Sequence, residues 1–102
     1  MKENNDYYEK LSDLFSVLSN PIRLRILETL MTHGKPNNKG CCVFEINNKV
    51  ELPQPYISKH LKILKDNGLL KYERSGNKII YSFDRNEYLN DLLEFIKKLD
   101  CC

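Results

Sequence analysis

The sequence predicts a mainly α-helical fold with one small β-hairpin. Over most of the chain, apolar residues recur at spacings of three and four, which is the repeat of one helix face. The spacing changes only between residues 69 and 83, where β-branched and aromatic residues flank Ser75-Gly76-Asn77 in the pattern of a hairpin. With 102 residues, 41% of them hydrophobic and 29% charged, the chain has the composition of a soluble globular protein, and we expect residues 1–102 to form a single domain.

Two helices are predicted before residue 34. The first, over residues 6–18, has an apolar face made of Tyr8, Leu11, Phe15 and Leu18. The second begins where Asn20 can cap a helix with its side chain and Pro21 suits the first position, because proline has no N–H to leave unpaired there. Its expected inward residues are Ile22, Ile26, Leu27 and Leu30.

A loop and two further helices are predicted next. Residues 34–40 form a loop by composition, because they are rich in Gly, Asn and Pro. The following helix is short, over residues 43–50. The next is entered through Pro53 and Pro55 and ends at Asn67-Gly68, where glycine can adopt a left-handed conformation. The expected inward residues are Val43, Ile46 and Val50 in the short helix and Ile57, Leu61 and Leu64 in the longer one.

The remainder of the chain predicts the hairpin and a last helix. The two strands are expected over residues 69–74 and 78–83, and the helix over residues 87–99. Its apolar stripe is wide for a terminal helix and contains Tyr88, Leu89, Leu92, Leu93, Phe95, Ile96 and Leu99. A short helix, a turn, a second helix and then a hairpin is the order of a winged helix-turn-helix.

Basic residues are concentrated in one part of the sequence. Residues 51–80 contain six Lys and Arg against three Asp and Glu, a net charge of +3, so the rest of the chain sums to −1. The helix over residues 54–66 has one apolar face and one polar face, the division that a DNA-reading helix needs. The predicted DNA-contacting residues are Gln54, Pro55, Tyr56, Ser58, Lys59, His60 and Lys62 on this helix, and Arg74, Asn77 and Lys78 at the hairpin. Each feature alone also fits an ordinary solvated surface, but their combination favours double-stranded DNA as the partner.

Two stretches resemble the ArsR/SmtB family of bacterial and archaeal repressors. They are Leu18-Ser19-Asn20-Pro21-Ile22-Arg23-Leu24-Arg25-Ile26-Leu27 and the segment from Gln54 to Leu70, the second being the more specific. The resemblance spans about residues 10–99 and implies a homodimer formed by the first and last helices. It also implies that the dimer occupies operator DNA and releases it when an inducer binds. Pro53 departs from the pattern, because the family usually has a capping Ser or Thr there.

Four cysteines, Cys41, Cys42, Cys101 and Cys102, are the predicted sensing residues. In a reducing cytosol such cysteines serve metal binding or redox sensing more often than disulfides. Arsenic-responsive members of the family open the third helix with Cys-Val-Cys-Asp-Leu. The matching stretch here is Cys42-Val43-Phe44-Glu45-Ile46, so Phe44 replaces the second cysteine. The pair Cys41-Cys42 would chelate one ion only if Cys41 lies in the preceding loop, because consecutive helical residues point about 100° apart.

Several inducers therefore remain open. Arsenite, which binds three thiolates, fits a site shared between the two cysteine pairs, within one subunit or across two. Cadmium, lead or zinc could use all four thiolates tetrahedrally, and a persulfide or oxidant could link one cysteine from each pair. No cofactor is obligatory in any of these schemes. A DNA-binding module with no small-molecule sensor is the further alternative. The zinc site that the family builds from Asp, His and Glu on the last helix is not expected, because residues 87–99 contain no histidine.

An enzyme is not expected. The sequence has no Cys-x-x-Cys redox motif, no phosphate-binding glycine loop and no recognisable Ser-His-Asp arrangement. It has no apolar run near the roughly 20 residues that a membrane-spanning helix needs, and its polar start lacks the apolar stretch of a secretion signal. A cytoplasmic protein with no membrane partner is the resulting expectation.

Overall fold

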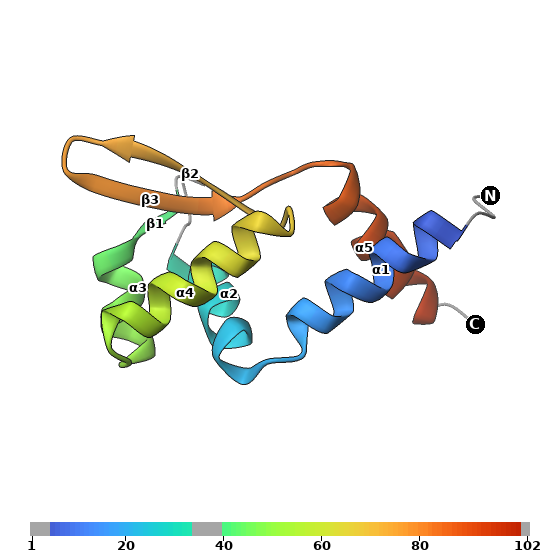
Figure 1. Ribbon diagram of the computed structural model, residues 1–102, viewed down its shortest axis with the longest axis horizontal. Helices are drawn as coiled ribbons and strands as arrows, with labels where there is room; N and C mark the ends of the chain where they lie inside the picture. Colours follow the sequence, from blue (N-terminus) through green and yellow to red (C-terminus); the bar gives the residue numbers. More distant parts are fainter. Residues whose placement is uncertain (1–4, 34–39, 101–102) are drawn as a thin grey trace.

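The computed structural model describes residues 5–33 and 40–100, which form five helices and three strands (Figure 1). In chain order these elements are α1 (Asn5–Leu18), α2 (Pro21–His33), β1 (Cys41–Cys42), α3 (Val43–Val50), α4 (Gln54–Asp66), β2 (Leu70–Ser75), β3 (Lys78–Phe83) and α5 (Glu87–Leu99). The helix-turn-helix α3–α4 followed by the hairpin β2–β3 confirms the predicted winged helix-turn-helix order. The predicted loop over residues 34–40 lies outside the described residues except for Gly40, and so do Cys101 and Cys102.

The core lies between α2, α3, α4 and the base of the hairpin. Ile57, Leu61 and Leu64 on α4 are each 0% exposed, as their spacing predicted. The other buried side chains of this region are Ile26, Leu27, Leu30, Cys41, Ile46, Val50, Leu69 and Leu70. Burial on one face of α4 fixes the rotation of this helix about its axis, and its opposite face therefore points to solvent.

The inward face predicted for α1 is partly wrong. Leu11, Leu14 and Val17 are buried, whereas Tyr8 and Phe15 are 45% and 37% exposed. The physical reason is that α1 has an apolar sector wider than the surface that α2 and α5 cover. Helical spacing locates such a sector but does not show which part of it meets the core of the same chain.

Helices α1 and α5 lie side by side at the end of the molecule away from the hairpin (Figure 1). The rings of Phe15 and Phe95 pack edge to face between them, with centroids 5.9 Å apart. Asn86 fixes the start of α5, because its side chain accepts a hydrogen bond from the Leu89 N–H and donates one to the Gly68 carbonyl. The chain is elongated, with extents of 44 × 27 × 24 Å. One half contains the helix-turn-helix and the hairpin, and the other contains α1 and α5.

The sheet contains one strand that the sequence did not predict. Strands β2 and β3 pair antiparallel around a two-residue loop with Gly76 at a φ of 68°, as the hairpin pattern indicated. The third strand, β1, pairs with β3 so that Cys41 lies opposite Tyr81. It enters through Gly40, where a Cβ would overlap the Tyr81 carbonyl oxygen. A two-residue strand has no period to detect, which is why sequence spacing missed it.

The predicted helix ends are confirmed at two positions. The Asn20 side chain accepts hydrogen bonds from the Ile22 and Arg23 N–H groups at the start of α2. After α4, Gly68 adopts a φ of 85°, and its N–H and that of Leu69 bond to carbonyls of the last helical turn. These caps fix both ends of the segment that contains the helix-turn-helix.

Candidate nucleic-acid interface

The outward face of α4 carries the residues predicted to contact DNA. Six of them are exposed, namely Gln54, Pro55, Tyr56, Ser58, Lys59 and Lys62. Pro53 occupies the N-cap position of α4 without a side-chain hydrogen bond to the helix, so the capping Ser or Thr of the family has no substitute here. The helix nevertheless begins at Gln54, because proline favours the first turn of a helix.

His60 differs from the other predicted residues because it is half-buried and bonded to another helix. Its Nδ1 accepts a hydrogen bond from Arg23 Nε of α2, at 3.2 Å. Burial, together with the charges of Arg23 and Lys59, holds the pKa of His60 below its ordinary value. The ring is therefore neutral near pH 7, and its Nδ1 is already occupied within the chain.

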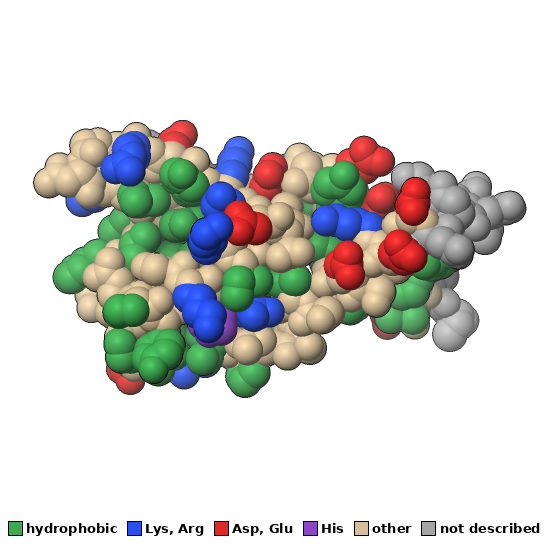
Figure 2. Space-filling view, viewed as in Figure 1, with side chains coloured by type: hydrophobic (Ala, Val, Ile, Leu, Met, Phe, Trp, Pro, Cys, Tyr) green, Lys and Arg blue, Asp and Glu red, His purple; other side chains and the backbone are tan. Residues whose placement is uncertain are grey.

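The hairpin tip supplies the remaining predicted residues. Arg74, Asn77 and Lys78 are all exposed. Figure 2 shows Lys and Arg side chains gathered over the hairpin and α4, and most Asp and Glu side chains over α1 and α5. On the face shown, the cationic side chains over α4 and the hairpin suit a phosphate backbone.

A groove of about 830 Å³ lies between α3, α4 and the hairpin. The predicted DNA-contacting residues that line it are Gln54, Ser58, Lys62, Asn77 and Lys78. The other five, Pro55, Tyr56, Lys59, His60 and Arg74, are not among its lining residues. Sequence reasoning missed Lys65 and Tyr72, which also line the groove with the Lys65 ammonium 5.6 Å from the centre of the Tyr72 ring. Lys65 contributed to the basic charge count, but its contact with a strand residue has no signal in the sequence.

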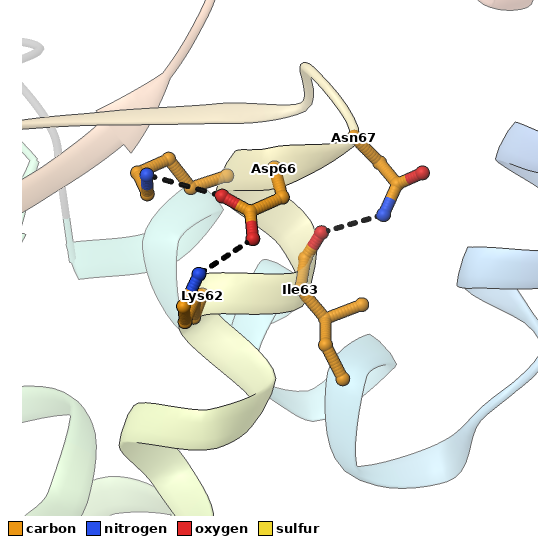
Figure 3. Close-up of polar contacts among 5 residues, drawn as sticks. Lys62, Ile63, Asp66 and Asn67 are labelled. Carbon is orange, nitrogen blue, oxygen red and sulfur yellow. Dashed lines mark hydrogen bonds and ion pairs between the residues drawn. The ribbon is translucent and has the colours of Figure 1, made fainter.

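Two lysines of this surface share one carboxylate (Figure 3). Lys62 Nζ lies 2.8 Å from one oxygen of Asp66, and Lys65 Nζ lies 3.1 Å from the other. Hydrogen bonds from Lys62 and Lys65 lower the pKa of Asp66, and the bond to Asp66 raises the pKa of Lys65. The four-residue spacing of Lys62 and Asp66 could have predicted one of these pairs. Asp66 therefore offsets part of the positive charge at the end of α4.

The adjacent cysteines Cys41 and Cys42 have different environments. Cys41 is 1% exposed, and burial, with the Glu45 carboxylate nearby, raises the pKa of its thiol. Cys42 is half-buried and lines the groove. Successive strand residues point to opposite faces, so the two thiols of the pair lie in different surroundings. Cys42 is the accessible thiol of the two and lies on the same surface as the predicted DNA-contacting residues.

The described residues do not make up a metal site by themselves. Across residues 5–33 and 40–100, no three His, Cys, Asp or Glu side chains lie close enough together to hold an ion. A thiolate site at Cys42 thus needs donors from elsewhere, and the predicted candidates Cys101 and Cys102 lie outside the described residues.

A second surface of interest is the apolar face of α1 and α5. Its exposed residues are Tyr8, Phe15, Tyr88, Leu93, Ile96 and Leu99. Leu99 is 69% exposed and Leu93 is 46% exposed. Large apolar side chains concentrated on neighbouring helices, rather than scattered singly, mark a surface that binds a partner.

Comparison with known proteins identifies the family. A model of the family described as "Bacterial regulatory protein, arsR family" matches residues 20–72. The arsenical resistance operon repressor of Staphylococcus xylosus is 34% identical, over 91% of this chain and 86% of the repressor. A helix-turn-helix transcriptional regulator of Methanocaldococcus jannaschii is 32% identical, over 90% of this chain and 97% of the regulator.

Solved structures extend the likeness to the fold. The crystal structure of the antimony-specific transcriptional repressor AntR matches with a TM-score of 0.66 and 28% identity, over 91% of this chain and 79% of AntR.

Within the part of the chain that the structure describes, no helix is both long and apolar enough to cross a bilayer.

Proposed function

Because the chain belongs to the ArsR family of bacterial regulatory proteins, we propose that it is a homodimeric, cytoplasmic repressor that leaves its operator when cysteine thiolates bind an inducer, most readily arsenite. The family consists of DNA-binding transcriptional regulators. For this chain, the proposal assigns the DNA-contacting residues, the dimer surface and the inducer site.

The observation that carries the proposal is the shared groove. Gln54, Ser58 and Lys62 from α4 and Asn77 and Lys78 from the hairpin line one concave surface. A helix that enters the major groove and a hairpin that touches the adjacent backbone need to face the same duplex. Gln54 suits adenine edges, whereas the lysines suit phosphates. Tyr56, Lys59 and Arg74 extend the proposed contact surface beyond the groove.

Dimerisation through α1 and α5 is supported by their exposed apolar face. An unpaired surface that contains Phe15, Leu93 and Ile96 is costly in water, and a two-fold axis would bury it against its own copy. Such a dimer carries two α4 helices, as binding to two half-sites requires.

The inducer site is proposed around Cys42. Its position on the DNA-facing groove means that an ion bound there would act directly at the surface that holds the operator. Trivalent arsenic binds soft thiolates, and Cys101 and Cys102 would complete a set of three. The likeness to repressors described as arsenical and antimony-specific favours a trivalent thiophilic ion. Cys41, which is buried in the core, is the least available of the four predicted ligands.

A redox sensor is the second candidate, favoured by a specific observation. The helix that follows Cys42, α3, offers no second thiolate, since the second cysteine of the motif is replaced by Phe44. A single accessible thiol can be oxidised to a disulfide with one other cysteine, or take the outer sulfur of an organic persulfide and release that donor's thiol, whereas it cannot chelate an ion alone. Cadmium, lead or zinc would need four thiolates, including that of Cys41.

The test is operator binding, measured by fluorescence anisotropy with a duplex that the fully reduced protein selects from a randomised library. Arsenite, Cd²⁺ and an organic persulfide are titrated separately. Release by arsenite that is lost in Cys42→Ser, and in a chain that ends at Asp100, supports the proposal. Cys41→Ser is the matched control and should keep its response. Release only by the persulfide, reversed by reductant, would assign the redox mechanism, and regulation unaffected by loss of all four cysteines would exclude a thiol sensor.

A further inference from the structure

The side chain of Arg23 joins three helices. At the start of α2, its Nη1 donates a hydrogen bond to the Val17 carbonyl near the end of α1, at 3.0 Å. Its Nε donates to His60 Nδ1 on α4, at 3.2 Å. The base of the side chain is fixed as well, because the Arg23 N–H is bonded to the Asn20 cap. One half-buried guanidinium thus connects the two-helix end of the molecule to the helix whose outer face carries the predicted DNA contacts.

We propose that Arg23 is a positioning residue for DNA binding, which holds α4 in register with α1 through the ring of His60. The inference rests on the proposed function, since it takes α4 to be the DNA-reading helix. It adds a route by which α1, which carries part of the proposed dimer surface, sets the orientation of α4. A displacement of α1 in the dimer would pull on Val17, Arg23 and His60 in turn.

The hydrogen bond between Arg23 and His60, here called the joint, depends on the protonation state of His60. Its Nδ1 accepts the Arg23 hydrogen bond only while it carries no proton, because a protonated ring would present an N–H to a guanidinium N–H. The charged groups that act on the ring are Arg23 from α2 and Lys59 from α4, and both disfavour the imidazolium, as burial does. The pKa of His60 is lowered, so the joint is intact at neutral pH and breaks as the pH falls below the ordinary range of histidine.

This arrangement makes the sign of the pH effect informative. An added proton on a surface near DNA raises its positive charge, which by electrostatics alone strengthens binding on acidification. If His60 holds α4 in place, acidification instead weakens binding, because the protonated ring releases Arg23. The two explanations therefore predict opposite slopes of DNA affinity with pH.

The experiment measures affinity for the selected duplex at pH 7.5 and pH 5.0, at constant ionic strength, for the full chain and its variants. The parent should bind more weakly at pH 5.0, by up to about tenfold, the loss expected from one hydrogen bond to a charged group. Arg23→Gln should show a similar loss at pH 7.5 and no further loss at pH 5.0. His60→Asn, whose amide oxygen can accept near the position of Nδ1 without titrating, should have the same affinity at pH 5.0 as at pH 7.5.

Two controls separate positioning from other effects. His33→Gln removes the other histidine and should retain the pH dependence of the parent. Light scattering and circular dichroism show whether each variant stays folded and keeps its assembly state; if Arg23→Gln does not fold, the pH profile of His60→Asn decides.

Two results would overturn the inference while leaving the proposed function intact. These are binding that tightens at pH 5.0 in the parent, and a folded Arg23→Gln variant with parental affinity. Selection of no duplex by the parent at either pH would instead overturn DNA binding itself.

Discussion

Asp66→Asn is expected to tighten DNA binding. The Asp66 carboxylate holds the ammonium groups of Lys62 and Lys65 at 2.8 and 3.1 Å, so under the proposed function it would compete with DNA phosphates for both lysines. The asparagine side chain has nearly the same shape but no charge. Because Lys62 and Asp66 are exposed and Lys65 is partly exposed, the fold and its unfolding temperature should be little affected.

The size of the effect follows from counterion release. Removing one negative charge from the DNA-facing surface should steepen the slope of log K against log salt by about 0.9, and by about 1.8 if both lysines become available to phosphates. We take the electrostatic contribution to binding as zero at 1 M salt. A slope change of about 0.9 then corresponds to about eightfold tighter binding at 0.1 M salt and about fourfold at 0.2 M. The gain should therefore shrink as salt rises.

The assay is a salt titration of duplex affinity by fluorescence anisotropy for the parent, Asp66→Asn and Asp13→Asn. Asp13 is an exposed residue of α1, so its substitution makes the same charge change away from the groove. A steeper slope in Asp66→Asn alone is the expected result. Weaker binding in Asp66→Asn, with an unchanged slope, would refute the reasoning, because it would mean that Asp66 orients the lysines productively.

Three further predictions concern assembly, thiol reactivity and stability. Leu93→Asp should shift the mass measured by light scattering from dimer to monomer, whereas Asn90→Asp, also on α5, should not; a dimeric Leu93→Asp would place the interface elsewhere. Cys42 should react with a maleimide before Cys41 in the native protein at pH 8, because burial raises the pKa of the Cys41 thiol and shields it; peptide mass spectrometry would show the opposite order if β1 were misplaced. Leu61→Ala should lower the free energy of unfolding by about 2–5 kcal/mol in a urea titration, since this side chain is 0% exposed, and a loss under ~1 kcal/mol would contradict its place in the core.

The helical part of the fold was predictable because its signals are local. The period of Ile57, Leu61 and Leu64 fixed the buried face of α4, and the turn at Gly68 needs a conformation that glycine adopts easily. Local spacing was less informative for α1. Leu14 is fully buried and Phe15 is not, although both lie in the same apolar sector. The difference depends on which neighbouring helix covers which part, and that information is not local.

The candidate site was predictable as a set of residues but not as an arrangement. Lysines and polar side chains on one face of α4 followed from helical geometry. The bond between Arg23 and His60 joins positions 37 residues apart, and the approach of Lys65 to Tyr72 depends on how the hairpin folds back over α4. Such contacts are set by tertiary packing, so spacing along the chain carries no trace of them.

The cysteine pair shows how one missed element changes a functional argument. The sequence left Cys41 and Cys42 as two equivalent candidate ligands, whereas the pairing of β1 with β3 buries the Cys41 thiol in the core and leaves Cys42 on the groove. Gly40 permits this pairing, since a Cβ at that position would overlap the Tyr81 carbonyl oxygen. A sensor built on this chain therefore either uses Cys42 with donors from outside the helix-turn-helix half, or must break the β1–β3 pairing to reach Cys41. The second route would couple inducer binding to the hairpin directly, and retention of the arsenite response in Cys41→Ser would exclude it.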